Sequence, residues 1–322
     1  MFEHFKQKSF ADRMKDTGYL LKNSFSLVGA NAGIVKPTVH MAIYSLLMTS
    51  LVVGALVLLL LRWHVGLGVG ALLFTVLVLL PFKFFYRTRQ KACQSWMTYQ
   101  AITGKVTPYP EAHRHTAAEK GRLRFIAFVD LLVAYAGSQR GQNREGVSAF
   151  VTNLFLSALV EVWDLVNHYM IPGVVIEQKP LKEIVPQLKA LRNNVPATLA
   201  GVFGIDFAGD VLKILLGPVY LVALAAGVGL SSLLGPSMPH TSWMIQGHAY
   251  TWVPVLVVLY LICCAGGVLK ACVESVKTIY FTIFYTAIMR PETIAPYLRS
   301  ELTHYLVLGD SAAAASAPDT KG

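Results

Sequence analysis

A stripe of polar and ionisable side chains marks one face of a segment that is otherwise apolar. At 100° per residue, five positions fall within about 80° of one another on a helix. We expect this helix to run from residue 147 to residue 171 and to break at the following Pro-Gly pair, residues 172–173. The stripe consists of Asn153, Ser157, Glu161, Asp164 and His168.

Three interpretations of the stripe differ in what surrounds it. It forms the solvated or lysine-paired edge of an amphipathic helix, or it lines an aqueous path for an ion or small polar solute. The second follows because ionisable groups inside a membrane are costly and usually face a cavity. The third is a metal site, since spacings of three and four bring carboxylates and an imidazole to one face. No second helix carries a matching set, so we predict no metal site.

Two further groups of charged residues could bind a cation, although each also has a simpler structural explanation. Asp206 and Asp210 lie one helical turn apart, which is unfavourable for like charges unless a cation or Lys213 intervenes. Residues 111, 115 and 119 are Glu, His and Glu, a spacing that could hold a divalent cation. However, a proline precedes the first glutamate, and acids in a first turn suit the helix dipole. We therefore predict a solvated helix start there.

The sequence contains no recognisable catalytic set. There is no Gly-x-Ser-x-Gly elbow, no phosphate-binding loop and no basic-aromatic nucleic-acid motif. The four cysteines include no CxxC pair, so reduced thiols are expected. We predict a protein that is not an enzyme, needs no cofactor and binds no nucleic acid.

The composition indicates a membrane protein. Of the 322 residues 54% are hydrophobic and only 14% are charged, whereas soluble proteins average about 25% charged. A helix needs about 20 apolar residues to cross a bilayer. Runs that meet this need occupy residues 39–61, 65–82, 214–234 and 252–271.

We therefore predict an all-α polytopic membrane protein with two transmembrane hairpins, hence four spans, plus amphipathic or re-entrant cytoplasmic helices. Residues 125–136 are a further apolar run, which would raise the number of spans to six if it and the stripe helix both crossed. That run is short and contains Asp130. The predicted regions are a basic amphipathic segment 1–38, hairpin 39–86, basic helical region 87–210, hairpin 211–272, cytoplasmic helices 273–309 and a disordered tail 310–322.

The distribution of lysine and arginine predicts the orientation. Among 28 such residues only Arg62 falls in the turns 62–64 and 235–251. The positive-inside rule then places both termini and the middle region in the cytoplasm, in a membrane such as the bacterial inner membrane. The net charge of +10 is explained by anionic lipid on the cytoplasmic side.

Gly66 and Gly70 have the four-residue spacing that lets helices approach closely in a bilayer. The spacing predicts close packing within the chain or between copies. Because four spans enclose little room for a pathway, a homo-oligomer is expected.

Residues 162–194, VWDLVNHYMIPGVVIEQKPLKEIVPQLKALRNN, resemble a pattern in uncharacterised prokaryotic integral membrane proteins and, more remotely, in choline transporter-like proteins. In that pattern an aromatic-rich helix ends in a proline, a few apolar residues and a glutamate, followed by an amphipathic helix. The matching positions are Trp163, Pro172 and Glu177. The resemblance implies an integral membrane protein, and it implies no substrate, because choline transporter-like proteins have many more spans.

Two functions fit these observations. The first is an oligomeric channel or transporter for an ion or small polar solute. The alternative is a non-catalytic scaffold or complex subunit that binds anionic lipid or protein partners.

The predicted topology can be tested with single cysteines and a membrane-impermeant thiol reagent. Positions replaced in 62–64 and 236–247 should react from outside the cell. Positions 105–120 and 178–195 should react only after the membrane is opened, because they belong to the basic side. Labelling of position 180 from outside would contradict the four-span topology.

Overall fold

The computed structural model describes residues 31–61, 64–138, 156, 160, 163, 166–187, 195–238, 241–245, 247–296 and 298, with only the backbone described for 185–187, 195–208 and 210. The chain forms two compact units. Unit 1 comprises residues 1–38, 84–205 and 274–322, and unit 2 comprises 39–83 and 206–273.

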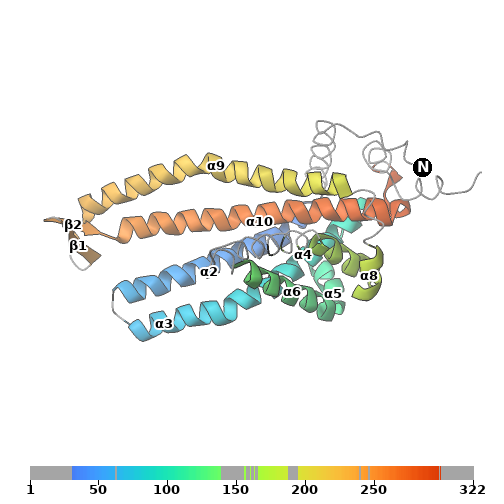
Figure 1. Cartoon of the computed structure of the whole chain (residues 1–322), viewed down its shortest axis with the longest axis horizontal. Helices are drawn as coiled ribbons and strands as arrows, with labels where there is room; N and C mark the ends of the chain where they lie inside the picture. Colours follow the sequence, from blue (N-terminus) through green and yellow to red (C-terminus); the bar gives the residue numbers. More distant parts are fainter. Residues whose placement is uncertain are drawn as a thin grey trace, which may run out of the picture. The chain divides into compact units, whose positions relative to one another are not determined.

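The described chain is predominantly helical, which confirms the all-α prediction (Figure 1). Residues 166–177 are helical between α6 and α8. In chain order the elements are η1 (Ala32–Val35), α2 (Lys36–Leu60), α3 (Val65–Phe74), the π-helical turn η2 (Thr75–Leu79), α4 (Leu80–Ile102), α5 (Tyr109–Ala118), α6 (Lys120–Ser138), α8 (Leu181–Gln187), α9 (Val195–Leu234), β1 (Ser242–Ile245), β2 (His248–Thr251), α10 (Val253–Met289) and η5 (Pro291–Thr293).

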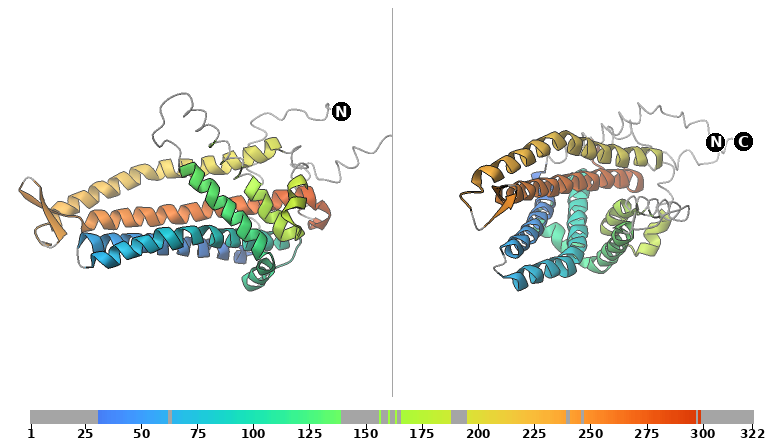
Figure 2. Two further views of the ribbon diagram at one scale, coloured as in Figure 1. Left: turned by 60° about the horizontal axis from the view of Figure 1, so that its bottom comes forward. Right: turned by 60° about the vertical axis from the view of Figure 1, so that its left-hand side comes forward.

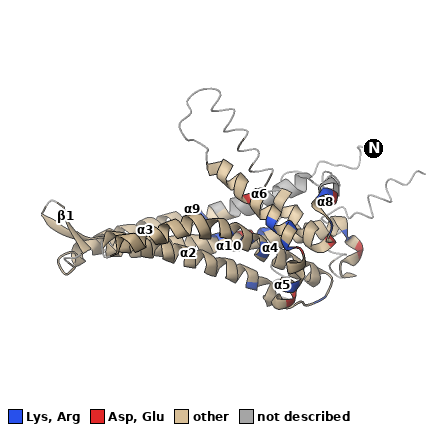
Figure 3. Cartoon of the chain, turned by 90° about the horizontal axis from the view of Figure 1, so that it is seen from below, with Lys and Arg blue, Asp and Glu red and all other residues tan. Residues whose placement is uncertain are grey.

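Four helical stretches of the described chain are long and apolar enough to cross a membrane. They are Ala32–Leu60, Val65–Ile102, Val211–Leu234 and Val253–Met289. Large apolar side chains point outward along them, including Leu77 on η2, which is 68% exposed. Figure 3 shows that α2, α3 and the neighbouring parts of α9 and α10 carry few charged residues. These helices identify the chain as a membrane-embedded protein.

The helices of unit 2 approach one another closely at small residues. A Cβ atom on Gly68 would lie 2.8 Å from Leu59 Cγ, so α3 packs tightly on α2. The Tyr260 hydroxyl of α10 lies 2.9 Å from Ser50 Oγ of α2. By contrast, a Cβ on Gly66 or Gly70 would meet no atom within 4 Å. Any close packing at these two glycines would therefore be between copies, which stays a prediction.

The polar turn after α9 folds into a two-stranded antiparallel hairpin that the sequence analysis did not predict. Trp243 on β1 pairs with Tyr250 on β2. Gly247, in the turn between the strands, has φ 81°, a conformation that glycine adopts without steric cost. Two aromatic side chains are thus cross-strand neighbours in this hairpin.

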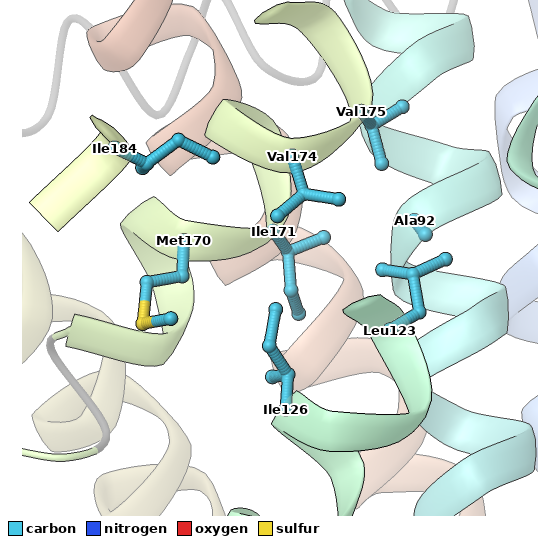
Figure 4. Close-up of a cluster of buried hydrophobic side chains, with 8 residues drawn as sticks. All are labelled: Ala92, Leu123, Ile126, Met170, Ile171, Val174, Val175 and Ile184. Atoms are coloured by element: carbon cyan, nitrogen blue, oxygen red, sulfur yellow. The ribbon is translucent and has the colours of Figure 1, made fainter. Parts of the chain in front are cut away.

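Unit 1 contains an apolar core formed by four helical segments (Figure 4). Trp96, Trp163, Val166 and Leu181 pack around it. The core thus joins α4, α6, α8 and the helical segment 166–177. Its buried members are Ala92, Leu123, Ile126, Met170, Ile171, Val174, Val175 and Ile184.

The helical segment 166–177 continues through Pro172 and Gly173, so the predicted break there is wrong. A proline inside a helix removes one hydrogen bond and costs roughly 3 kcal/mol. The packing offsets that cost, because Val174 and Val175 are fully buried. The helix ends instead at Gln178, where φ is 54°.

Replacing Gly173 should destabilise unit 1. A Cβ there would lie 2.8 Å from Ile184 Cγ2, so Gly173→Val should cost about 1–3 kcal/mol by overpacking. The matched control is Gly121→Val on the exposed side of α6, where a Cβ meets nothing within 4 Å. Thermal unfolding in detergent measures both variants. Equal midpoints for the two variants would contradict the close approach of α8.

Candidate functional site

A continuous set of polar side chains joins α4 to α10 inside unit 1, and we call it the polar seam. At 100° per residue its members on each helix fall within an arc of about 100°, which places them on one side of the helix. Its α4 members are Arg87, Lys91, Gln94 and Ser95, its α10 members are Glu274, Ser275, Thr278 and Thr282, and Thr38 at the start of α2 completes it.

An ion-pair cluster forms one end of the seam. The Glu274 carboxylate pairs with the Arg87 guanidinium and with Lys91 Nζ, the latter at 2.6 Å. Lys91 is only 5% exposed. His168 lies near enough to Glu274 for a protonated imidazole to stabilise the carboxylate. Because charges removed from water are stable only when paired, each partner depends on the others.

Hydrogen bonds between uncharged groups continue the seam beyond these ion pairs. Gln94 Nε2 lies 2.5 Å from Ser275 Oγ and 3.2 Å from Thr38 Oγ1, and donates to both. The Thr38 hydroxyl in turn donates to Ser275 Oγ at 2.6 Å. Farther along α10, the Thr282 hydroxyl lies 2.9 Å from Ser95 Oγ. Three separate segments of unit 1 are thus joined by polar contacts.

Only one member of the sequence-predicted stripe lies among the described residues, namely His168. Its side chain is 4% exposed, and its ring centroid lies 4.9 Å from that of Phe281 on α10. At this position the stripe faces α10 and not a water-exposed edge. The other four members, Asn153, Ser157, Glu161 and Asp164, lie outside the described residues.

Asp130 on α6 accepts hydrogen bonds from the helix that carries His168. Its Oδ1 is 3.1 Å from Trp163 Nε1 and 3.3 Å from Asn167 Nδ2. Asn167 is 2% exposed. The one acidic residue of α6 therefore has donors inside unit 1.

The weaker predicted cation sites have different outcomes. Asp206 and Asp210 lie on α9, but their side chains are outside the described part. Among the described residues, no three His, Cys, Asp or Glu side chains are grouped as metal ligands would be.

The solvated helix start predicted around residue 111 is confirmed. Glu111 is exposed in the first turn of α5, next to Pro110. His115 stacks on Trp96 with ring centroids 3.6 Å apart. Glu119 pairs with Arg122. The Glu, His and Glu of this pattern therefore have separate surroundings.

Glu177, the glutamate of the resemblance pattern, binds Arg290 and so joins the helical segment 166–177 to the end of α10. Arg290 donates Nε to Oε1 at 2.7 Å and Nη2 to Oε2 at 2.8 Å. Hydrogen bonding to the Glu177 carboxylate raises the pKa of Arg290. Such two-pronged contacts between guanidinium and carboxylate groups fix geometry as well as charge.

No family model matches the chain, and no curated protein or solved structure is similar to it. The resemblance to choline transporter-like proteins therefore stays a prediction.

The sequence analysis missed the whole seam, although the signal on α10 is readable. Thr278, Thr282 and Thr286 recur every four residues in the stretch 278–289, which is otherwise apolar and largely aromatic. Thr278 and Thr282 donate to the carbonyl four residues earlier. A threonine hydroxyl that donates within its own helix needs no partner on another helix. A row of such threonines is therefore easily taken for part of an apolar helix.

Removing the seam carboxylate should destabilise the protein. Glu274→Gln leaves Arg87 and Lys91 without their acceptor, and breaking one partner of a buried pair costs about 3–5 kcal/mol. Adding Lys91→Met should restore part of the loss, because it removes one stranded charge. Thermal unfolding in detergent, with the exposed Glu292→Gln as control, measures the effect. A Glu274→Gln variant as stable as the control would show that the pair is solvated.

Proposed function

We propose that this protein is a membrane transport protein that moves an ion or small polar solute as a homo-oligomer. The observation that carries the proposal is the polar seam. Its ionisable members Arg87, Lys91 and Glu274 lie on α4 and α10, and both helices are candidate membrane spans. Charged groups in a membrane-spanning helix are costly. They usually face the interior of the protein, where they mark pathways for ions or polar solutes.

The stripe supports the same function. His168 faces α10 from the neighbouring helical segment and interacts electrostatically with Glu274. Imidazole is the side chain whose charge changes most readily near neutral pH. Asp164 and Glu161, four and seven residues earlier in the sequence, would extend this set of titratable groups along the transport path.

Several copies of the chain would form the pathway. Four membrane-spanning helices leave little room for an aqueous path through one copy. The outward-facing glycines Gly66 and Gly70 offer a surface without bulky side chains for contact between copies.

The alternative is a scaffold or complex subunit that binds anionic lipid or protein partners. The observation in its favour is the close pairing of the seam, in which Glu274 has two cationic partners and Gln94 binds two hydroxyls. A network of this kind stabilises a structure without conducting anything. Flux measurements separate the two functions.

The stripe should control flux through the protein. Purified protein in liposomes, with a trapped pH-sensitive dye and imposed gradients of H⁺, K⁺ or Cl⁻, should dissipate at least one gradient faster than empty liposomes. His168→Ala and Asp164→Asn should change that rate or its pH dependence at least several-fold, because both substitutions remove a titratable group.

The matched control is His113→Ala, which removes a partly buried imidazole on α5 outside the seam. Thermal unfolding must show that each variant is folded before its flux is compared. Full flux at every pH in folded His168→Ala and Asp164→Asn variants would favour the scaffold. The scaffold would also be favoured if liposomes that contain the wild-type protein kept all three gradients.

A further inference from the structure

Helix α6 has an outer face that is apolar where a water-facing helix would be polar. Four large side chains on this face are between 48% and 66% exposed. At 100° per residue they fall within about 80° of one another. They are Phe125, Phe128, Leu132 and Tyr135.

The opposite face of α6 is occupied within unit 1. Leu123 and Ile126 belong to the apolar core, and Ala127 is fully buried. Asp130 lies on this inner face, where Trp163 and Asn167 donate to it. The one charge of the stretch 125–138 is thus turned away from the outer face. A helix that is apolar all round is found in a protein core or in a membrane.

We propose that the outer face of α6 lies among the acyl chains of one membrane leaflet, without crossing the bilayer. Residues 125–138 would be about 21 Å long at 1.5 Å per residue. The hydrocarbon core is about 30 Å thick. The helix is therefore too short to cross, but long enough to be immersed in one leaflet.

The charges at the start of α6 suit the lipid headgroups. Lys120 and Arg124 are exposed in its first turns, whereas residues 125–138 have no basic side chain. When the apolar end of a helix is immersed in the acyl chains, cations at its other end lie at the level of the lipid phosphates. A soluble partner would need no such division into a basic start and an apolar remainder.

The position of α6 along the chain's own membrane span also favours lipid. The second apolar run ends at Phe82, and Ala92, which shares a core with α6, follows ten residues later on α4. That separation is about 15 Å of helix. Figure 2 shows α6 running obliquely to α4, and in Figure 3 α6 is mostly uncharged. The part of α4 that packs on α6 thus follows the apolar run after about three helical turns.

Site-directed spin labelling of the full chain in liposomes tests the proposal. Single cysteines at Phe125, Phe128, Leu132 and Tyr135 are introduced into a chain whose native cysteines are replaced, and nitroxide labels are attached. The liposomes contain phosphatidylcholine and phosphatidylglycerol at three to one. Collision with oxygen reports lipid, and collision with a water-soluble nickel chelate reports water. Leu77→Cys on a candidate span is the lipid control, and Val106→Cys in the loop after α4 is the water control.

We expect all four labels to collide with oxygen as the Leu77 label does and to be at least several-fold less accessible to nickel than the Val106 label. Nickel accessibility equal to that at Val106 would place the face in water and overturn the proposal. Low accessibility to both reagents would also overturn it, because the face would then be covered by protein, either a second copy or another segment of this chain. A label at Ala127→Cys, which is buried against the core, gives the reference accessibility for a site protected from both reagents.

Discussion

Polar groups that are buried in unit 1 need hydrogen-bonding or ionic partners, and the structure of unit 1 depends on this requirement. Lys91 and Gln94 are almost completely buried, and neither could remain there without the groups of α10 that receive them. An unpaired buried charge costs several kcal/mol, whereas apolar side chains of similar volume can replace each other at little cost. The polar seam therefore fixes which face of α4 meets α10 more strictly than apolar packing could.

The two long helices that carry the seam change character along their length. In unit 2, α10 exposes large aliphatic side chains such as Leu261, which is 58% exposed. In unit 1 the same helix carries Glu274 and a row of threonines facing α4, together with fully buried aromatic side chains such as Phe281 and Phe284. A single helix thus passes from a surface suited to lipid to a surface suited to protein. The ion pairs of Glu274 lie where this change along α10 begins.

The sequence predicted the features that depend on composition over many residues. The four apolar stretches and the solvated start of α5 at Glu111 are such features, since length and local dipoles decide them. It did not predict the hairpin at Trp243 and Tyr250, because four-residue strands give too short a pattern. It wrongly predicted a helix break at Pro172, because the contact between Gly173 and Ile184 is between segments and cannot be read locally. Of the candidate site, the stripe was visible from helical periodicity, whereas the partners of His168 on α10 could come only from the folded chain.

If the polar seam lines the proposed transport path, water must reach it, and the accessibility of Ser275 in liposomes tests this requirement most directly. Ser275 is buried between Gln94 and Thr38. In a chain with no other cysteine, Ser275→Cys should react with a water-soluble, membrane-impermeant thiol reagent, and flux should fall as the reaction proceeds. A thiol that stays unmodified while flux continues, yet reacts once the protein is unfolded, would contradict the account.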